Sequence, residues 1–219
     1  MDFVDLETMF TESKWKILTE LAKSASSPSQ LAKSTGTSVA NISVQLKLLE
    51  AMGFVRIEKL SNISKGEPRK LYSLNRAICY MILSTSQTSG KKLIELEDDM
   101  IPYFSVWLLK DNDISRVLIK YLCSNEVLQE SSSLGYLGLK DGIIELVALH
   151  PDPAKLHELS ERNVSFFQKN FIIQLHSHSI EDFRKGFENK EEYFNNTIKR
   201  VFILKDRDNV LSKMKKGEK

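Results

Sequence analysis

The stretch SQLAKSTGTSVANISVQLKLLEAMGFV, residues 29–55, decides how the first third of this chain folds. Its first segment is short and stops at Gly36, a residue type that favours the left-handed conformation found after helix ends. Thr37 or Ser38 then caps a longer helix that runs to about Met52, and Gly53 lies just past its end. Two helices joined by so short a turn predict a helix-turn-helix unit.

The flanking segments complete the order of a winged helix. Upstream, residues 6–23 place apolar side chains at helical spacing, and Ser27 followed by Pro28 predicts the cap and first position of the next helix. Downstream, residues 54–59 and 69–74 predict two strands joined by a polar loop. Three helices followed by a hairpin are therefore expected.

The helix at about 38–52 has a face suited to the major groove of DNA. Val39, Ile42, Leu46 and Leu49 follow a three-four-three spacing and are expected to point into the core. The opposite face is small and polar, and its amides can bind adenine bidentately. The alternative is an ordinary three-helix core with a polar outer surface. The residues expected on the outer face are Ser38, Ala40, Asn41, Val44, Gln45 and Lys47.

Positive charge is concentrated on this third of the chain, although the whole protein carries a net charge of only +2. Lys65, Arg69 and Lys70 flank the expected wing tip, where they would reach phosphate or the minor groove. The basic residues between positions 23 and 76 are Lys23, Lys33, Lys47, Arg56, Lys59, Lys65, Arg69, Lys70 and Arg76, against the acidic residues Glu50, Glu58 and Glu67.

Over about residues 10–75 the chain resembles the ArsR/MarR-type winged-helix transcription regulators. The pattern Leu-x-x-Leu-Glu-x-x-Gly-Phe-Val at residues 46–55 is a specific part of the resemblance. The resemblance implies a homodimer that binds double-stranded DNA, with Ser38, Asn41, Val44 and Gln45 facing the bases. The chain lacks the Cys-x-Cys pattern of the metal-sensing members and has no histidine before residue 150, so no metal or cofactor is expected.

Residues 77–130 are predicted to form a helical linker with many large apolar side chains. These side chains either fill a core between domains or form a dimer interface, and the second interpretation is favoured because one chain has limited core to cover them. A Ser/Thr/Gly-rich segment at 84–90 is expected to be a hinge or a loop.

Residues 131–219 are predicted to form a second, α+β domain. Strands are expected at 133–139 and 142–149, joined through the hairpin signal Asp141-Gly142, followed by a helix at 153–169, a strand at 171–176 and further helices. This order is similar to small nucleotidyltransferase domains of the polymerase-β type, which some archaeal winged-helix regulators carry at this position. The fold class expected for the whole chain is thus α+β, with a winged helix at 1–76, a helical linker and this domain.

The active site of those nucleotidyltransferases is not matched. They need a Gly-Ser turn and two carboxylates one residue apart that hold two Mg²⁺ ions. The second predicted strand carries only Glu145, and no Ser follows Gly135 or Gly138. We expect no catalysis, no catalytic residues and no metal site, with His176 and His178 lying on the surface. The domain is expected to bind a protein or small-molecule partner instead.

The remaining features indicate a cytoplasmic, nucleoid-associated protein. Cys79 and Cys123 lie in apolar surroundings without a Cys-x-x-Cys pair, which is typical of a reducing compartment. The N-terminus does not resemble a signal peptide, and no apolar run is long enough to span a membrane. The function expected is a sequence-specific regulator; the alternatives are a chromatin-type protein of low specificity and an active nucleotidyltransferase with an accessory winged helix.

Overall fold

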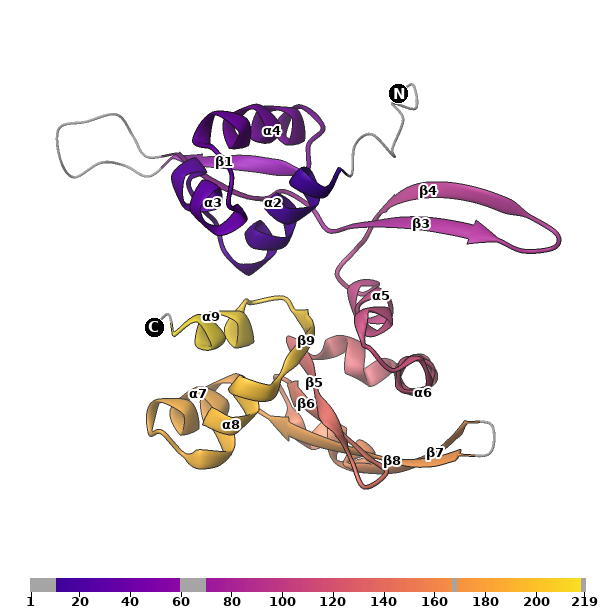
Figure 1. Ribbon diagram of the computed structural model, residues 1–219. Coiled ribbons are helices and arrows are strands. Elements are labelled where there is room, and N and C mark those ends of the chain that lie inside the picture. Colours follow the sequence, from indigo (N-terminus) through magenta and orange to yellow (C-terminus); the bar gives the residue numbers. More distant parts are fainter. Residues whose placement is uncertain (1–10, 60–69, 167–168, 218–219) are drawn as a thin grey trace. The chain divides into compact units, whose positions relative to one another are not determined.

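The computed structural model describes residues 11–59, 70–166 and 169–217. The chain divides into two compact units, Met1–Glu95 and Leu96–Lys219, and each contains both helices and strands (Figure 1). The predicted α+β class is therefore confirmed.

The first unit contains the predicted winged helix. Its strands β1 and β2 pair antiparallel, with Val55 opposite Leu74. The elements follow the predicted order of three helices and a hairpin: α2 (Glu12–Lys23), α3 (Pro28–Thr35), α4 (Val39–Ala51), β1 (Val55–Lys59) and β2 (Lys70–Leu74). The expected wing loop, with Lys65 and Arg69, lies outside the described residues.

Local capping explains where these helices begin and end. The Ser27 side chain accepts a hydrogen bond from the Gln30 amide, and the Gln30 side chain accepts one from the Ser27 amide, so α3 starts with a capping box. Gly36 follows the helix with φ of +69°, the left-handed conformation that glycine adopts without strain. Of the two residues predicted as the cap of α4, Ser38 is the one that accepts from the Asn41 amide.

The winged-helix core is built from one face of each helix and the inner side of the hairpin. Ile42, Leu46 and Leu49 are fully buried, as predicted. The same prediction is wrong for Val39, whose side chain is 48% exposed. Val39 is the first residue of α4 and lies at the edge of the apolar stripe, about 60° around the helix axis from Ile42, so nothing covers it. The core residues are Ile17, Leu18, Leu21, Leu31, Ala32, Ile42, Leu46, Leu49, Phe54, Val55 and Tyr72.

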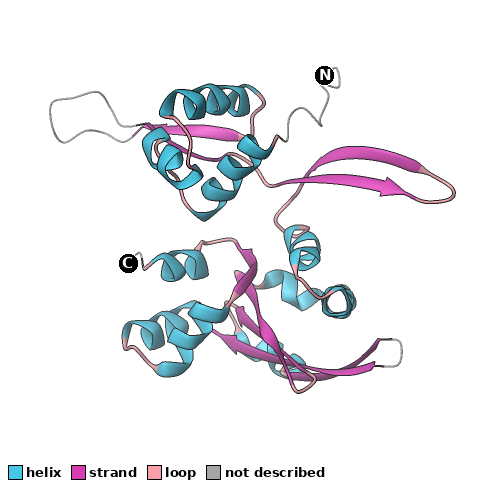
Figure 2. Ribbon diagram, in the orientation of Figure 1, coloured by secondary structure: helices cyan, strands magenta, loops and turns pink. Residues whose placement is uncertain are grey.

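A second hairpin ends the first unit and corrects the predicted helical linker. Strands β3 (Ile78–Ser84) and β4 (Ser89–Glu95) pair antiparallel along their whole length (Figure 2). A short, continuous apolar run such as residues 78–83 has no periodicity that separates a strand from a helix, which is why helix was predicted. Residues 85–88 form the connecting turn, in which the Thr85 hydroxyl oxygen accepts from the amides of Gln87 and Thr88.

The rest of the predicted linker is helical and belongs to the second unit. Its elements are α5 (Ile101–Ser105), the 3-10 turn η1 (Val106–Leu108), α6 (Asn112–Cys123) and η2 (Glu126–Glu130). Helix α6 is capped by Asp111, whose carboxylate accepts from the amides of Asp113 and Ile114.

A mixed, five-stranded sheet forms the centre of the second unit, with strand order β7-β8-β6-β5-β9. Only β6 and β8 are parallel neighbours; the other pairs are antiparallel. Asp141 and Gly142 form the predicted turn between β5 and β6, with φ of +51° and +80°. The strands are β5 (Ser133–Lys140), β6 (Ile143–Leu149), β7 (Glu161–Phe166), β8 (Lys169–His178) and β9 (Phe202–Asp206).

Helices cover both faces of this sheet, because neighbouring strand residues point to opposite sides. Leu146 belongs to the cluster formed with α6, whereas Val147 belongs to the cluster formed with α7 (Ile180–Glu188), α8 (Glu192–Arg200) and α9 (Val210–Lys216). The strands thus carry apolar side chains on both faces.

The prediction of a helix at 153–169 is wrong. Residues 153–159 form the short 3-10 helix η3 (Pro153–Leu159), and the chain then enters β7. Val164 and Phe166 pack against the α6-side cluster while Ser165, between them, is exposed. This alternation buries apolar surface in a strand and would not do so in a helix.

Candidate functional site

The exposed face of α4 gathers four of the residues predicted to bind DNA. Ser38, Asn41, Val44 and Lys47 are all exposed, and Val44 is 55% exposed. The face is set by the burial of Ile42, Leu46 and Leu49 on the opposite side of the helix. Lys70, also predicted, is exposed at the start of β2, and two further predicted residues, Lys65 and Arg69, lie outside the described residues.

Asn41 is held in place by its neighbours. Its side-chain nitrogen Nδ2 donates to the Thr37 hydroxyl oxygen over 3.1 Å. Since Nδ2 carries two hydrogens, one N–H and the carbonyl oxygen Oδ1 remain without a partner among the described residues. An oriented amide with one free donor and one free acceptor matches the N6 and N7 edge of adenine.

Gln45 departs from the expectation that it faces outward. Its side chain is half-buried, and its oxygen Oε1 is enclosed without a hydrogen-bond partner in the described part of the chain. Gln45 lies about 60° around the helix from Ile42, on the flank of the buried stripe, so the core reaches part of its side chain.

Two exposed apolar residues of α4 were missed. Leu48 is 47% exposed and Val39 is 48% exposed, although both are apolar enough to be taken for core. Leu48 could have been found, because it lies outside the three-four-three spacing of the buried positions. Apolar side chains on such a face fit the methyl group of thymine.

The basic residues of the first unit divide into two groups. Lys33, Lys47 and Lys70 form no ion pair among the described residues and are exposed. Arg56 and Arg76 instead have structural partners: Arg56 pairs with Glu58, and Arg76 pairs with Glu95 over 2.9 Å. Fewer basic side chains are therefore available to meet phosphate than the sequence count implied, and Lys33, Lys47 and Lys70 are among those that are.

The comparisons with known proteins agree with this geometry. Residues 11–56 match the family model described as bacterial regulatory protein, arsR family. The helix-turn-helix is therefore similar to that of the arsR family. The match covers 46 of the 219 residues and supports a DNA-binding transcription regulator, because the matched segment runs from α2 through α4 to β1. No curated protein matches the chain.

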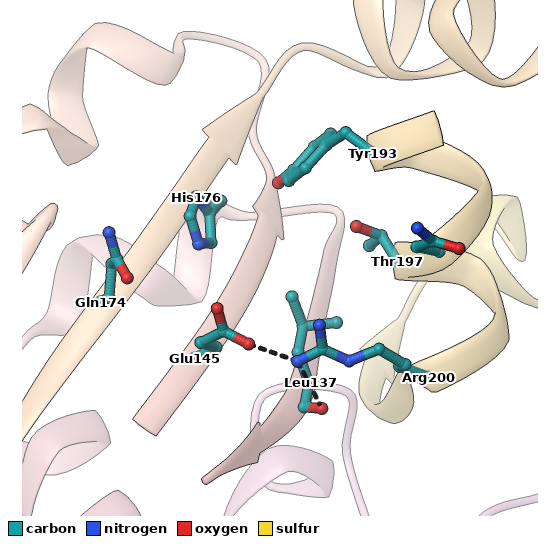
Figure 3. Close-up of a pocket in the computed structure, with 8 residues that line it drawn as sticks. Leu137, Glu145, Gln174, His176, Tyr193, Thr197 and Arg200 are labelled. Atoms are coloured by element: carbon teal, nitrogen blue, oxygen red, sulfur yellow. Dashed lines mark hydrogen bonds and ion pairs between the residues drawn. The ribbon is translucent and has the colours of Figure 1, made fainter. Parts of the chain in front are cut away.

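A separate cavity lies within the second unit, on the α8 side of the sheet (Figure 3). Its volume is about 380 Å³. Strands β5, β6 and β8 form its floor and α8 its wall, so residues distant in sequence converge there. The lining residues are Leu137, Glu145, Gln174, His176, Tyr193, Asn196, Thr197 and Arg200.

One ion pair organises the cavity. The Arg200 nitrogen Nη2 donates to Oε2 of Glu145 and, over 3.2 Å, to the carbonyl oxygen of Leu137 (Figure 3). Glu145 is the carboxylate predicted on the second strand, and its ion pair with Arg200 was not visible in the sequence. Within the described residues, no group of three or more His, Cys, Asp and Glu side chains is placed to hold a metal ion.

The two histidines of β8 lie on the same side of the strand. His176 and His178 both contact the ring of Tyr193, and His178 shares a 3.1 Å hydrogen bond with its hydroxyl. Both are half-buried rather than fully on the surface, which corrects the sequence expectation. Burial lowers the pKa of His178, and the neighbouring His176 lowers this pKa further. Asp182 raises it by a smaller amount.

Acid is expected to destabilise the second unit through His178. Because its pKa is lower in the folded state, the unfolded chain takes up the proton first as the pH falls below about 6.5. The free energy of unfolding is therefore highest above that pH and declines as the pH falls through the folded-state pKa. Urea denaturation at pH 7 and pH 5 measures the decline, which should shrink in His178→Asn; an equal decline in both proteins contradicts this role.

No helix of the described residues is long and apolar enough to cross a membrane.

Proposed function

We propose that this protein is a sequence-specific transcription regulator that inserts α4 into the major groove of double-stranded DNA. The observation that carries the proposal is the exposed face of α4, where Ser38, Asn41, Val44 and Lys47 stand clear of the core. The family match to residues 11–56 supports it, since this segment contains the whole helix-turn-helix.

The two kinds of residue on this surface have different tasks. Asn41 and Val44 present hydrogen-bonding and apolar groups to base edges, which supply the choice of sequence. Lys33, Lys47 and Lys70 meet phosphates, which supply affinity for any sequence and make it depend on salt. The expected loop residues Lys65 and Arg69 belong to the same phosphate-binding group.

Single substitutions separate these tasks. Asn41→Ala should weaken binding to the preferred site about 10- to 100-fold and leave binding to random DNA unchanged. Lys47→Ala should weaken both equally and reduce the slope of log affinity against log salt by about 1. Gel shifts on recovered genomic sites and on random duplexes, at two salt concentrations, measure both effects. Gln45→Met is the matched control on the same helix, because the half-buried amide is not placed to read a base.

The same assay distinguishes the alternatives. Discrete sites bound roughly a thousandfold more tightly than random DNA establish a specific regulator. Broad occupancy without such a ratio indicates a chromatin-type protein instead. Absence of binding at both salt concentrations refutes the DNA-binding proposal.

We further propose that the regulator acts as a homodimer that pairs through β3 and β4. Met81, Ile82 and Leu83, in the second half of β3, are 39%, 71% and 45% exposed although all three are apolar. An isolated two-stranded hairpin is only marginally stable in water, so this surface gains from being covered. A second copy offers the same apolar strand, and two recognition helices would read two half-sites.

Ile82→Asp tests the dimer. A charge at this 71% exposed position should convert the protein to a monomer without unfolding the winged helix, because Ile82 lies outside its core. Sedimentation equilibrium gives the mass. Leu139→Asp, at another exposed apolar position in the second unit, is the control and should remain dimeric. A wild-type protein that sediments as a monomer contradicts the proposal.

A further inference from the structure

We propose that the cavity in the second unit is a binding site for a small zwitterion of the α-amino acid type. The cavity is lined entirely by residues of Leu96–Lys219, so the proposal goes beyond DNA binding and does not depend on it. On this proposal, the second unit recognises a small molecule.

The charges of the lining argue against a strongly charged ligand. Among its Asp, Glu, Lys and Arg side chains, the lining carries one carboxylate, Glu145, and one guanidinium, Arg200, and these two are paired with each other. A phosphate or a dicarboxylate would add negative charge that the lining does not balance, whereas a ligand with no net charge keeps the site neutral.

Each member of the pair also keeps an unused charged atom. Among the described residues, Oε1 of Glu145 and Nη1 of Arg200 have no hydrogen-bond partner, because their contact uses Oε2 and Nη2. Figure 3 shows Oε1 directed toward His176 and Nη1 directed into the space below Tyr193 and Thr197. A free negative acceptor and a free positive donor therefore lie beside one another.

An α-amino acid carries two opposite charges that complement these two atoms. One carbon separates its ammonium from its carboxylate, so the ammonium can donate to Oε1 while the carboxylate accepts from Nη1. Each contact joins two opposite formal charges, whereas a sugar or nucleoside would offer only uncharged groups to the same two charged atoms. This favours the zwitterion over an uncharged ligand of equal size.

The rest of the cavity suits a small polar side chain. The side chains of Gln174 and His176 have no hydrogen-bond partner among the described residues, and both face the cavity from β8 (Figure 3). A volume of about 380 Å³ lies at the small end of ligand pockets. Burial raises the pKa of Tyr193, so its hydroxyl stays neutral and can orient a ligand by hydrogen bonding.

The test is calorimetric titration of the full chain with a panel of common α-amino acids at millimolar concentration. Each is paired with its amide, which lacks the carboxylate, and with its N-acetyl derivative, which lacks the ammonium. We expect at least one amino acid to bind and to raise the melting temperature by roughly 5–10 °C near saturation, with neither derivative doing so. A polyol and a nucleoside complete the panel.

Substitutions test whether the ligand binds in the cavity. Arg200→Gln should weaken binding at least about 10-fold. Lys199→Gln, the neighbouring exposed position on α8, removes the same charge outside the cavity and should bind as wild type. If Arg200→Gln does not fold, Asn196→Leu at the exposed edge of the cavity should also weaken binding.

Four results overturn the proposal: no binding by any amino acid, equal binding of the amides, wild-type affinity in the cavity variants, or protection by the polyol or nucleoside alone. DNA affinity measured without ligand is independent of all four, so failure here leaves the proposed regulator standing.

Discussion

Leu46→Ala is expected to lower the free energy of unfolding of the winged helix by about 2–5 kcal/mol. Leu46 is 0% exposed and lies among the side chains of all three helices and the hairpin. Its removal costs the transfer free energy of the lost methyl groups and leaves a cavity that close-packed neighbours fill only in part. Stability of small domains is itself about 5–15 kcal/mol, so the loss is large.

Leu48→Ala is the matched control, two residues away on the same helix. Leu48 is 47% exposed, so the same truncation should change stability by less than about 0.5 kcal/mol. Urea denaturation followed by Trp15 fluorescence, in a Trp107→Phe background, reports on the first unit alone. Similar losses in the two variants would mean that α4 does not pack through the face described.

Gly186→Ala is expected to destabilise the second unit by about 1–3 kcal/mol. Alanine in the middle of a helix normally stabilises a protein by up to about 1 kcal/mol relative to glycine. A loss of stability in Gly186→Ala would therefore be informative by its sign alone. A Cβ atom at Gly186 would lie 2.2 Å from two ring carbons of Phe194, closer than any real contact. The close approach lets α7 pack against α8, which carries Tyr193, Thr197 and Arg200 into the cavity.

The effect of Gly186→Ala on stability should change sign when the Phe194 ring is removed. In a Phe194→Ala background the clash is gone, and Gly186→Ala should stabilise by up to about 1 kcal/mol. A four-protein thermodynamic cycle, measured by urea denaturation at neutral pH, gives the coupling between the two positions. Additive effects would show that α7 and α8 do not meet at Gly186. Gly90→Ala, where an added Cβ meets open space, controls for glycine replacement itself.

The candidate DNA-binding face could be predicted because α4 is defined by local signals. Its caps, its polar outer residues and its buried spacing all lie within fifteen residues of one another. Gln45 and Val39 were placed wrongly because both lie at the edges of the apolar stripe. At those positions helical spacing does not decide whether a side chain is buried or exposed, and the packing of neighbouring elements decides it instead.

The cavity could not have been found in this way. Glu145 and Arg200 are 55 residues apart, and they meet only because β6 lies beneath α8. The sequence shows a single carboxylate on a strand, which excluded the two-metal pattern but gave no indication of its ionic partner.

By itself the sequence determined the elements whose ends are fixed by neighbouring residues. Ser27 with Gln30, Gly36, Ser38 and the Asp141-Gly142 turn act through hydrogen bonds and backbone angles that span a few positions. Tertiary structure decided the segments with weak local preference. Residues 78–83 became a strand through pairing with β4, and residues 161–166 through pairing with β8, because backbone groups there are satisfied only by a partner distant along the chain.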